Sequence, residues 1–279
     1  MLSYRHIYHA GNHADVLKHL VQIQVLRHLI GKDKPLCYLD THAGSGSYAL
    51  GSTAALRNSE FATGIGRLWE RTDLPDAVAA YVAVVRAVNP GGALARYPGS
   101  PEFARQLLRP QDRLVLCELH PDDRRRLRAQ CAGDRRVRIE EDGFHAVRAL
   151  LPPIERRGLV FIDPPYEVKT DYQAVVDALV AAHRRFATGV YAIWYPVVDR
   201  ERVDQLERKV KASGIRDIRL FELSVRPDSA GHGMTGSGML VVNPPWTLAA
   251  DLAAALPYLA QVLGEAGGGS HRSEVLAAE

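Results

Sequence analysis

Short apolar runs bounded by glycine, proline or polar residues recur along the chain and predict the strands of a sheet. The run at residues 159–163 is apolar until Asp163 and lies between Gly158 and Pro164. Such a run is typical of a strand buried on both faces of a parallel sheet, and it ends at Asp163 because Pro164 has no amide hydrogen. Further runs of this kind bring the expected number of strands to seven: residues 36–39, 113–120, 137–140, 189–196, 216–225 and 238–243.

Stretches with helical periodicity separate these runs, as expected for an α/β fold. Residues 13–30 carry apolar side chains around nearly the whole circumference, which predicts a helix buried on more than one side. Asn12 is a good N-cap for this helix, and Asp15 favours its positive end. Lys18 and His19 fall inside it, where the spacing alone also fits a lysine that extends towards solvent and a hydrogen-bonded core histidine.

The helical patterning also predicts how the chain is divided. Residues 51–89 are too long for a single crossover helix and predict a small helical insertion. Residues 1–50 and 90–264 are expected to form the main α/β domain, with a polar and aromatic tail at residues 1–12. Residues 265–279 begin with a glycine-rich stretch and end in polar residues, so we expect a disordered tail.

The composition is that of an ordinary soluble globular protein, with 47% hydrophobic and 24% charged residues among 279. No apolar run approaches the length of a membrane span, and the start of the chain lacks the apolar core of a secretory signal. We therefore expect a cytoplasmic protein without a membrane partner. Cys37, Cys117 and Cys131 lie far apart, so neither a disulfide framework nor a metal site is predicted.

The net charge of +3 is mildly basic, yet arginine residues cluster along the chain. The clusters lie at residues 124–128, 135–138, 156–157 and 184–185. Such clusters suit a polyanion that is held by its phosphates, but each also fits a solvated helix face or loop. Charge alone therefore permits a nucleic acid partner without establishing one.

The tetrapeptide Asp163-Pro164-Pro165-Tyr166 brings specific chemistry to the end of its strand. An exocyclic amine on an aromatic ring is a poor nucleophile because its lone pair is delocalised. The Asp163 carboxylate and the Pro164 carbonyl could each accept one amine hydrogen, and Tyr166 could stack on the ring. The tetrapeptide resembles the motif of methyltransferases that modify N6 of adenine with S-adenosylmethionine. A Pro-Pro turn with a surface tyrosine is the plain alternative.

A second stretch, Asn243-Pro244-Pro245-Trp246, also follows an apolar strand, and it resembles an accepted variant of the same motif. The order of the strands distinguishes the two. The catalytic tetrapeptide belongs after the fourth strand, next to the strand that carries the cofactor loop, whereas Asn243 follows the seventh. We therefore assign the motif to Asp163.

Residues 40–47 read Asp-Thr-His-Ala-Gly-Ser-Gly-Ser, and the two glycines let the backbone pass close beneath a ligand. This loop resembles the Asp-x-x-x-Gly-x-Gly loop of Rossmann-like methyltransferases, although a dinucleotide oxidoreductase would open in a similar way. Glu118 ends the second strand and could accept both hydroxyls of a ribose, or pair with a nearby arginine. After the third strand, Asp142 could accept from an adenine amino group, and Gly143 would let the base approach.

The order of these motifs is similar to that of one family in particular. The glycine loop, the strand-ending acid, Asp-Gly and Asp-Pro-Pro-Tyr follow one another, and residues 1–6, 12–19 and 97–101 match as well. Together they resemble the bacterial large-subunit ribosomal RNA adenine-N6 methyltransferase J family, to about Leu263. The resemblance implies a Rossmann-like class I S-adenosylmethionine-dependent methyltransferase. Its seven-stranded, mostly parallel sheet would have an antiparallel last strand, and it would carry a small helical insertion.

The resemblance also implies the substrate, the cofactor and the site residues. The enzyme would use S-adenosylmethionine, without a metal ion, to methylate N6 of one adenosine (an adenine 2030 type site) in 23S ribosomal RNA. Asp163 would be the catalytic residue. The residues around the cofactor would be His19, His42, Ser100, Glu118, Asp142 and Gly143. Those facing the RNA would be Tyr4, His6, Lys18, Pro164 and Tyr166.

Other functions remain open at this point. A DNA adenine-N6 methyltransferase would share the site but is expected to carry a dedicated base-reading domain, and the insertion is short. A protein glutamine methyltransferase is expected to have asparagine in place of Asp163. A noncatalytic RNA-binding protein would not need the aligned cofactor acids. We expect a monomer without an obligate protein partner, acting on the RNA before full subunit assembly.

Overall fold

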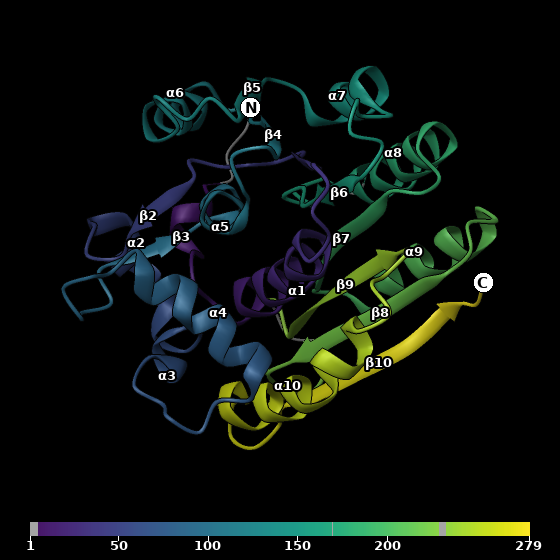
Figure 1. Ribbon diagram of the computed structural model, residues 1–279. Coiled ribbons are helices and arrows are strands. Elements are labelled where there is room, and N and C mark those ends of the chain that lie inside the picture. The colour runs from purple at the N-terminus through teal and green to yellow at the C-terminus, as the bar shows by residue number, and fades with distance from the viewer. Residues whose placement is uncertain (1–4, 169, 229–232) are drawn as a thin grey trace.

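One twisted sheet runs through the centre of the molecule, with helices on both of its faces (Figure 1). The computed structural model describes residues 5–168, 170–228 and 233–279. Within them the sheet has eight strands in the order β10-β8-β9-β7-β6-β1-β4-β5. The strands are β1 (Cys37–Asp40), β4 (Arg113–Cys117), β5 (Val137–Glu140), β6 (Gly158–Ile162), β7 (Val190–Val197), β8 (Ile218–Ser224), β9 (Gly236–Val242) and β10 (Ser270–Ala277).

The sheet is mostly parallel, as the sequence predicts. β5, β4, β1, β6 and β7 pair in parallel. β9 lies between β7 and β8 and is antiparallel to both, so the expected antiparallel insertion of the last predicted strand is present. All seven predicted strands are found, which confirms the α/β fold class.

The expected number of seven strands and the disordered tail are wrong. Most of the segment 265–279 folds as β10, an eighth strand that pairs antiparallel with β8 from Ser270 to Ala277. Arg272 on this strand reaches Glu207 at 3.1 Å, and Leu276 is buried. The glycine-rich stretch before β10 suggested disorder in the sequence. The segment is ordered because it pairs with β8, which is distant in the chain.

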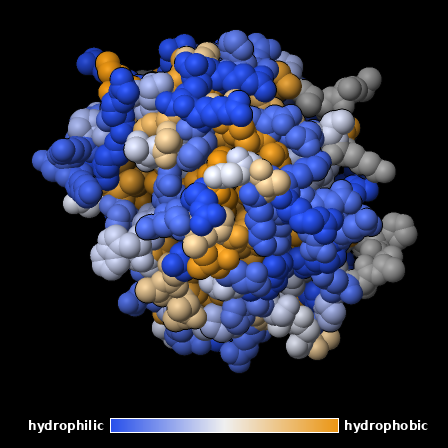
Figure 2. All heavy atoms as spheres, turned by 90° about the vertical axis from the view of Figure 1, so that its right-hand side faces the viewer, coloured by the Kyte–Doolittle hydropathy of each residue, from blue (hydrophilic) through white to orange (hydrophobic). Residues whose placement is uncertain are grey.

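The helices form two layers. One face of the sheet carries α1 (His13–Ile30), α4 (Asp76–Ala87), α5 (Ser100–Leu107), α6 (Pro121–Gln130) and α10 (Leu248–Leu263). The other face carries α7 (Gly143–Leu150), α8 (Thr170–Arg185) and α9 (Arg200–Ala212). Among the described residues, no helix is both long and apolar enough to cross a lipid bilayer. The side where α8, α9 and β10 lie is largely hydrophilic, with apolar residues gathered towards its centre (Figure 2).

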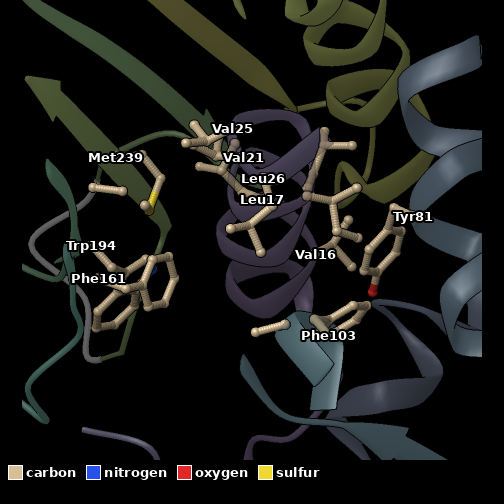
Figure 3. Packing of buried hydrophobic residues seen from close by; sticks show 14 of the residues in the cluster. Val16, Leu17, Val21, Val25, Leu26, Tyr81, Phe103, Phe161, Trp194 and Met239 are labelled. Atoms are coloured by element: carbon tan, nitrogen blue, oxygen red, sulfur yellow. The ribbon is translucent and has the colours of Figure 1, made fainter. Parts of the chain in front are cut away.

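α1 is the central helix of the first layer. Its apolar side chains meet Phe161, Trp194 and Met239 of the sheet on one side, and Tyr81 of α4 and Phe103 of α5 on the other (Figure 3). The helix has the predicted bounds, and the Asn12 side chain caps it by accepting from the amide of Asp15. Because both sides are covered, five polar residues of α1 are buried as well: Asp15, Lys18, His19, Gln22 and Gln24.

The segment between β2 (Ser47–Ala49) and β3 (Arg96–Pro98) is mainly helical. β2 and β3 pair as a short antiparallel ladder beside the main sheet. Between them lie α2 (Thr53–Asn58), η2 (Glu60–Ala62), α3 (Gly66–Trp69) and α4. Gly64 of this segment packs against the backbone of Gly11, where an added Cβ would lie 2.1 Å from the Gly11 carbonyl oxygen. The expected division at residues 51 and 89 stays a prediction.

A chain truncated after Gly269 lacks β10, and we expect its thermal unfolding midpoint to fall by several degrees. The edge of β8 loses its partner and the buried Leu276 is removed, and each kcal/mol lost lowers the midpoint by about 2–4 °C for a domain of this size. Circular dichroism during heating measures the change. Removal of Glu279 alone, beyond the strand, is the control. Equal midpoints for the intact chain and the chain truncated after Gly269 would contradict this prediction.

Candidate active site

The sheet changes direction of winding at β1, which has β4 on one side and β6 on the other. In open α/β sheets, ligands bind beyond the carboxyl ends of the strands at such a switch point. An acid stands at this end of each of four neighbouring strands: Asp40 ends β1, and Glu118, Asp142 and Asp163 follow β4, β5 and β6. The topology therefore brings together acids that are distant in the sequence.

Asp163 lies in a buried chain of ion pairs. The Nζ atom of Lys18 is 2.6 Å from Asp163 Oδ2 and 2.8 Å from Asp15 Oδ1, and the Lys18 side chain is only 4% exposed. Asp15 Oδ2 lies 2.9 Å from His6 Nε2 and accepts the Gly11 amide at 2.8 Å. The side chain of Asp163 keeps 13% exposure. Lys18 is thus bound within the protein, and does not extend towards solvent.

Burial and neighbouring charge compete at these groups. Burial alone would lower the pKa of Lys18, but the carboxylates of Asp15 and Asp163 raise it, so Lys18 stays an ammonium. Burial would likewise raise the pKa of Asp15, but His6 and Lys18 hold it well below its usual range. At Asp163 burial prevails and raises the pKa, although Lys18 opposes the rise. The charge of Asp163 therefore depends on Lys18.

Tyr166 is fixed beside Asp163 by contacts with the next strand. Its backbone has a φ of 51°, a left-handed conformation that turns the chain directly after the two prolines. The hydroxyl group donates to the carbonyl of Trp194 on β7 at 2.7 Å, and the ring lies 4.5 Å from that of Tyr172. The ring centroid of Trp194 lies 5.3 Å from Lys18 Nζ. The end of β6 is thus attached to β7 and α1 by side chains.

The glycine loop after β1 closes onto Glu118. Gly44 and Gly46 have φ angles of 60° and 85°, which a side chain would strain, and a Cβ on Gly44 would lie 2.2 Å from the Tyr48 hydroxyl. The Gly44 amide donates to Glu118 Oε2 at 2.8 Å, and the His120 amide donates to Oε1 at 2.7 Å. Burial raises the pKa of Glu118. Each carboxylate oxygen retains a lone pair for a further donor, so this loop and acid fit an adenosyl cofactor.

Asp40 is a site residue that the sequence analysis did not single out. Its Oδ2 atom accepts hydrogen bonds from the hydroxyls of Tyr38, at 2.8 Å, and Ser100, at 2.7 Å. Gln22 of α1 supports both partners by donating to the Tyr38 hydroxyl and the Ser100 carbonyl. Burial raises the pKa of Asp40 to about 6. The sequence carried a signal for this residue, because Asp40 occupies the first position of the Asp-x-x-x-Gly-x-Gly pattern.

The two predicted cofactor histidines have different surroundings. His19 is buried, its Nδ1 atom lies 2.8 Å from the Tyr97 hydroxyl, and its ring centroid is 4.6 Å from that of Phe103. Burial holds the pKa of His19 well below its usual range. His42 follows β1 and meets Phe144 edge-on at 5.2 Å, and burial lowers its pKa to about 4. Both imidazoles are therefore neutral at pH 7.

Asp142 and Gly143 have structural tasks that the sequence analysis did not foresee. Asp142 caps α7, accepting the amide of His145 at 3.0 Å. A Cβ on Gly143 would lie 2.1 Å from the Thr41 carbonyl oxygen, so glycine is required by close packing against the loop after β1. The expected approach of a base to Gly143 stays a prediction.

The remaining predicted residues lie at the amino terminus and in the motif itself. Tyr4 lies outside the described residues. His6 is brought to Asp15, and its ring lies 5.1 Å from that of Tyr48. Pro164 is buried directly after Asp163. Asp15 is a second residue whose task was missed, since the sequence suggested only a favourable charge at the start of α1.

The second Pro-Pro motif lies at the opposite edge of the sheet. β9 is antiparallel to β7 and ends where β7 begins, with Val242 opposite Tyr191. Asn243 uses its amide group to donate to the carbonyls of Ala187, at 2.8 Å, and Gly189, at 2.7 Å. It therefore stands apart from the acids at the carboxyl ends. The residues that the structure describes contain no group of three or more His, Cys, Asp or Glu suited to a metal ion.

A family model described as "Ribosomal RNA large subunit methyltransferase D, RlmJ" matches residues 33–276. The chain belongs to the RlmJ family. It is 54% identical over 270 residues to ribosomal RNA large subunit methyltransferase J of Escherichia coli (strain K12), covering 96% of each chain. The protein of the same name from Haemophilus influenzae is 51% identical over 281 residues, covering 100% of both chains. The predicted family is thereby confirmed.

Solved structures agree with the fold. A crystal structure of a protein from Legionella pneumophila str. Philadelphia 1 has a TM-score of 0.89 and 39% identity, covering 96% of this chain and 98% of that chain. A probable spermidine synthase from Corynebacterium glutamicum has a TM-score of 0.50 at 13% identity, covering 92% of this chain and 75% of that chain. The second likeness concerns the fold alone. The methyltransferase assignment comes from membership of the RlmJ family, and the parallel sheet with helices on both faces has the Rossmann-like architecture.

The buried Asp40 carboxyl predicts a pH-dependent difference between the Asp40→Asn variant and the parent. A folded-state pKa raised to about 6 means that this group favours folding below its unfolded pKa, and that the benefit is lost as the pH rises through 6. Asparagine does not titrate. The unfolding free energy of the variant relative to the parent should therefore rise by roughly 2.4 kcal/mol from pH 4 to pH 7.

Urea denaturation at several pH values measures this difference. A constant offset from the amide group cancels in the pH dependence, so only the slope is informative. A difference that stays constant over this range would mean that Asp40 titrates normally in the folded protein.

Proposed function

We propose that this protein transfers a methyl group from S-adenosylmethionine to N6 of a specific adenosine, an adenine 2030 type site, in 23S ribosomal RNA. Membership of the RlmJ family supports a ribosomal RNA methyltransferase. The observation that carries the proposal is the position of Asp163. Its carboxylate lies at the carboxyl end of β6, beside the switch point where the glycine loop, Asp40 and Glu118 meet.

The cofactor would lie across the carboxyl ends of β1, β4 and β5. The loop at Gly44 would pass beneath its methionyl part, and Glu118 would accept hydrogen bonds from the ribose hydroxyls. Asp142 would accept from the adenine amino group. The other residues assigned to this pocket are His19, His42, Ser100 and Gly143. When bound, S-adenosylmethionine supplies an electrophilic methyl group on a sulfonium.

The target amine would be held by the tetrapeptide. Lys18 donates to Oδ2 of Asp163, which leaves Oδ1 as the acceptor for one amine hydrogen. The Pro164 carbonyl would accept the other, which aims the nitrogen lone pair away from both acceptors. Tyr166 would stack on the flipped base, and stacking of this kind contributes about 1–3 kcal/mol per base against the unstacking cost.

The charge of Asp163 would act mainly on the transition state. The nitrogen–carbon bond would form as the methyl–sulfur bond breaks, and the methylated nitrogen would then lose one proton to water. As the amine nitrogen becomes cationic, a nearby carboxylate stabilises it more than it stabilised the neutral amine, and this difference lowers the barrier. Asp15 and Asp163 share the single ammonium of Lys18. The ammonium therefore does not cancel the negative charge of the group, and it opposes the protonation of Asp163 that burial favours. His6 would help to hold this arrangement through Asp15, and Tyr4 would contact the RNA.

The alternatives are less well supported. The relatives are named as ribosomal RNA methyltransferases, which disfavours DNA as the substrate. A noncatalytic RNA-binding protein would have no use for four acids at the carboxyl edge of the sheet. We further propose action in the cytoplasm, on RNA that is not yet fully assembled into the subunit, without an obligate protein partner.

The Asp163→Asn variant should lose turnover by about 10²–10³-fold, the scale for removing one preorganised electrostatic group. Asparagine can still accept a hydrogen bond but carries no charge, whereas the cofactor pocket keeps its residues. Methyl transfer to 23S RNA measures the rate, and calorimetry with S-adenosylmethionine should show little change in affinity. Asp177→Asn, an exposed substitution of the same kind on α8, is the control. A near-parental rate for Asp163→Asn would remove its proposed role.

Labelled S-adenosylmethionine tests the substrate. We expect methyl incorporation into protein-free 23S RNA, less into assembled large subunits, and none into duplex DNA. Digestion of the product to nucleosides should give N6-methyladenosine. Labelling of DNA in preference to RNA would overturn the proposed substrate, and equal labelling of free RNA and assembled subunits would overturn the proposed timing.

A further inference from the structure

The second Pro-Pro motif presents a tryptophan to solvent at the edge of the sheet opposite Asp163. Trp246 is 85% exposed, although most large apolar side chains of the described residues are buried. The catalytic proposal does not use it. An exposed tryptophan can stack its ring against a partner. The residues next to Trp246 and their charges indicate which kind of partner fits.

Trp246 is held in place by its backbone. Asn243 has a φ of 50° and is fixed by three hydrogen bonds. Its side-chain amide donates to the carbonyls of Ala187 and Gly189, and its backbone amide donates to the carbonyl of Asp217. Two prolines follow, and α10 then begins at the buried Leu248. The turn is therefore rigid, and ordering it on binding would cost little.

The neighbouring surface is the end of α1. The ring of His28 meets Trp246 edge-on at 6.4 Å, and His28 Nδ1 lies 3.5 Å from the Thr247 hydroxyl. The chain then leaves α1 through the exposed segment 31–35. Arg157, from the loop before β6, donates to the carbonyls of Leu29 and Lys34. The end of α1, the start of β6 and the Trp246 turn thus form one continuous surface.

This surface is rich in cations. Its basic residues are Lys32, Lys34, Arg109 and Arg157, which hydrogen bonds connect, and Arg27 and Arg156 are exposed neighbours of His28 and Arg157 in the sequence. Asp33 and Asp112 pair with Arg109, and Glu155 pairs with Arg113. Asp217 and Asp251 lie beside the Trp246 turn. Burial and the like charge of Arg109 lower the pKa of Arg157, as expected where cations crowd together. No ion pair within the described residues neutralises Lys32 or Lys34.

We propose that this surface, defined by Trp246, His28, Lys32, Lys34 and Arg157, binds a single-stranded segment of the RNA substrate outside the target site. One base would stack on Trp246, and the flanking phosphates would lie against the cations. The proposal rests on the proposed function only in taking RNA as the substrate. A protein partner is less well matched, because the cations at the end of α1 and before β6 would need a strongly acidic partner surface.

The distance between the two sites means that the affinity should depend on the length of the RNA. β6 separates this surface from Asp163, and five residues of parallel strand span roughly 17 Å. A short stem-loop that only fills the catalytic edge would not reach Trp246. A longer transcript with single-stranded flanks would reach both sites, and its affinity would gain from the second contact.

The test compares two RNAs with the full-length protein: the shortest stem-loop that is methylated, and a longer 23S transcript that contains it. Trp246→Ala should raise the KM for the longer RNA about tenfold, with kcat unchanged and the short RNA unaffected. Trp246→Phe should restore most of the affinity because phenylalanine can still stack. Val275→Ala, at an exposed apolar position on β10, is the matched control.

A second variant, Lys32→Gln with Lys34→Gln, tests the charges. Binding of the longer RNA, measured by filter retention without cofactor, should weaken and depend less steeply on salt concentration. Equal losses on both RNAs, or no loss on the longer one, would overturn the proposal. This test can be told apart from that of the proposed function. If the parent protein methylates neither RNA, the proposed function is refuted. Filter retention measures RNA binding at the surface without catalysis and tests the surface alone.

Discussion

A single ammonium group, that of Lys18, connects the parts of the molecule on which the candidate chemistry depends. An unpaired charge in the interior is strongly unfavourable, so Lys18 is compatible with the fold only where Asp15 and Asp163 both reach it. Asp163 belongs to the sheet and Asp15 to the first turn of α1. The requirement to pair the ammonium therefore fixes how α1 lies against β6, and with it where the reactive carboxylate stands.

The packing of α1 explains how such a charge can be buried at all. The helix lies between the sheet and the layer formed by α4 and α5 (Figure 3), so the polar side chains on its covered turns, from Asp15 to Gln24, are shut off from water. Gln22 and His19, one turn or less from Lys18, also find partners within the protein, on Tyr38 and Tyr97. α1 therefore joins the Asp163 and Asp40 networks while its apolar residues form the core.

The sequence predicts well those features that depend on nearby residues. The seven strands, the bounds of α1 and the Asn12 cap follow from periodicity, proline positions and capping preferences, which are local. β10 was missed because an edge strand with charged residues is recognised by its partner β8, which lies about 50 residues earlier. The tasks of Asp15 and Asp40 were missed for the same reason, since Asp40 meets Ser100 and Asp15 is joined to Asp163 through Lys18. The sequence analysis explained Gly143 by the approach of a ligand. In the structure, a side chain at this position would clash with the backbone of Thr41.

The two Pro-Pro motifs show how strand direction separates similar local sequences. Each follows an apolar strand of the same sheet, but β6 is parallel to β7 and β9 is antiparallel to it, so the motifs emerge at opposite edges. At the carboxyl edge, Asp163 meets an ammonium and retains an acceptor oxygen. At the other edge, Asn243 donates both hydrogens of its amide to backbone carbonyls, a bonding pattern that a carboxylate could not provide. The side chain at the first position of each motif thus matches the groups that strand direction places around it. Direction in turn explains why one motif suits chemistry on an amine while the other is a rigid support for an exposed ring.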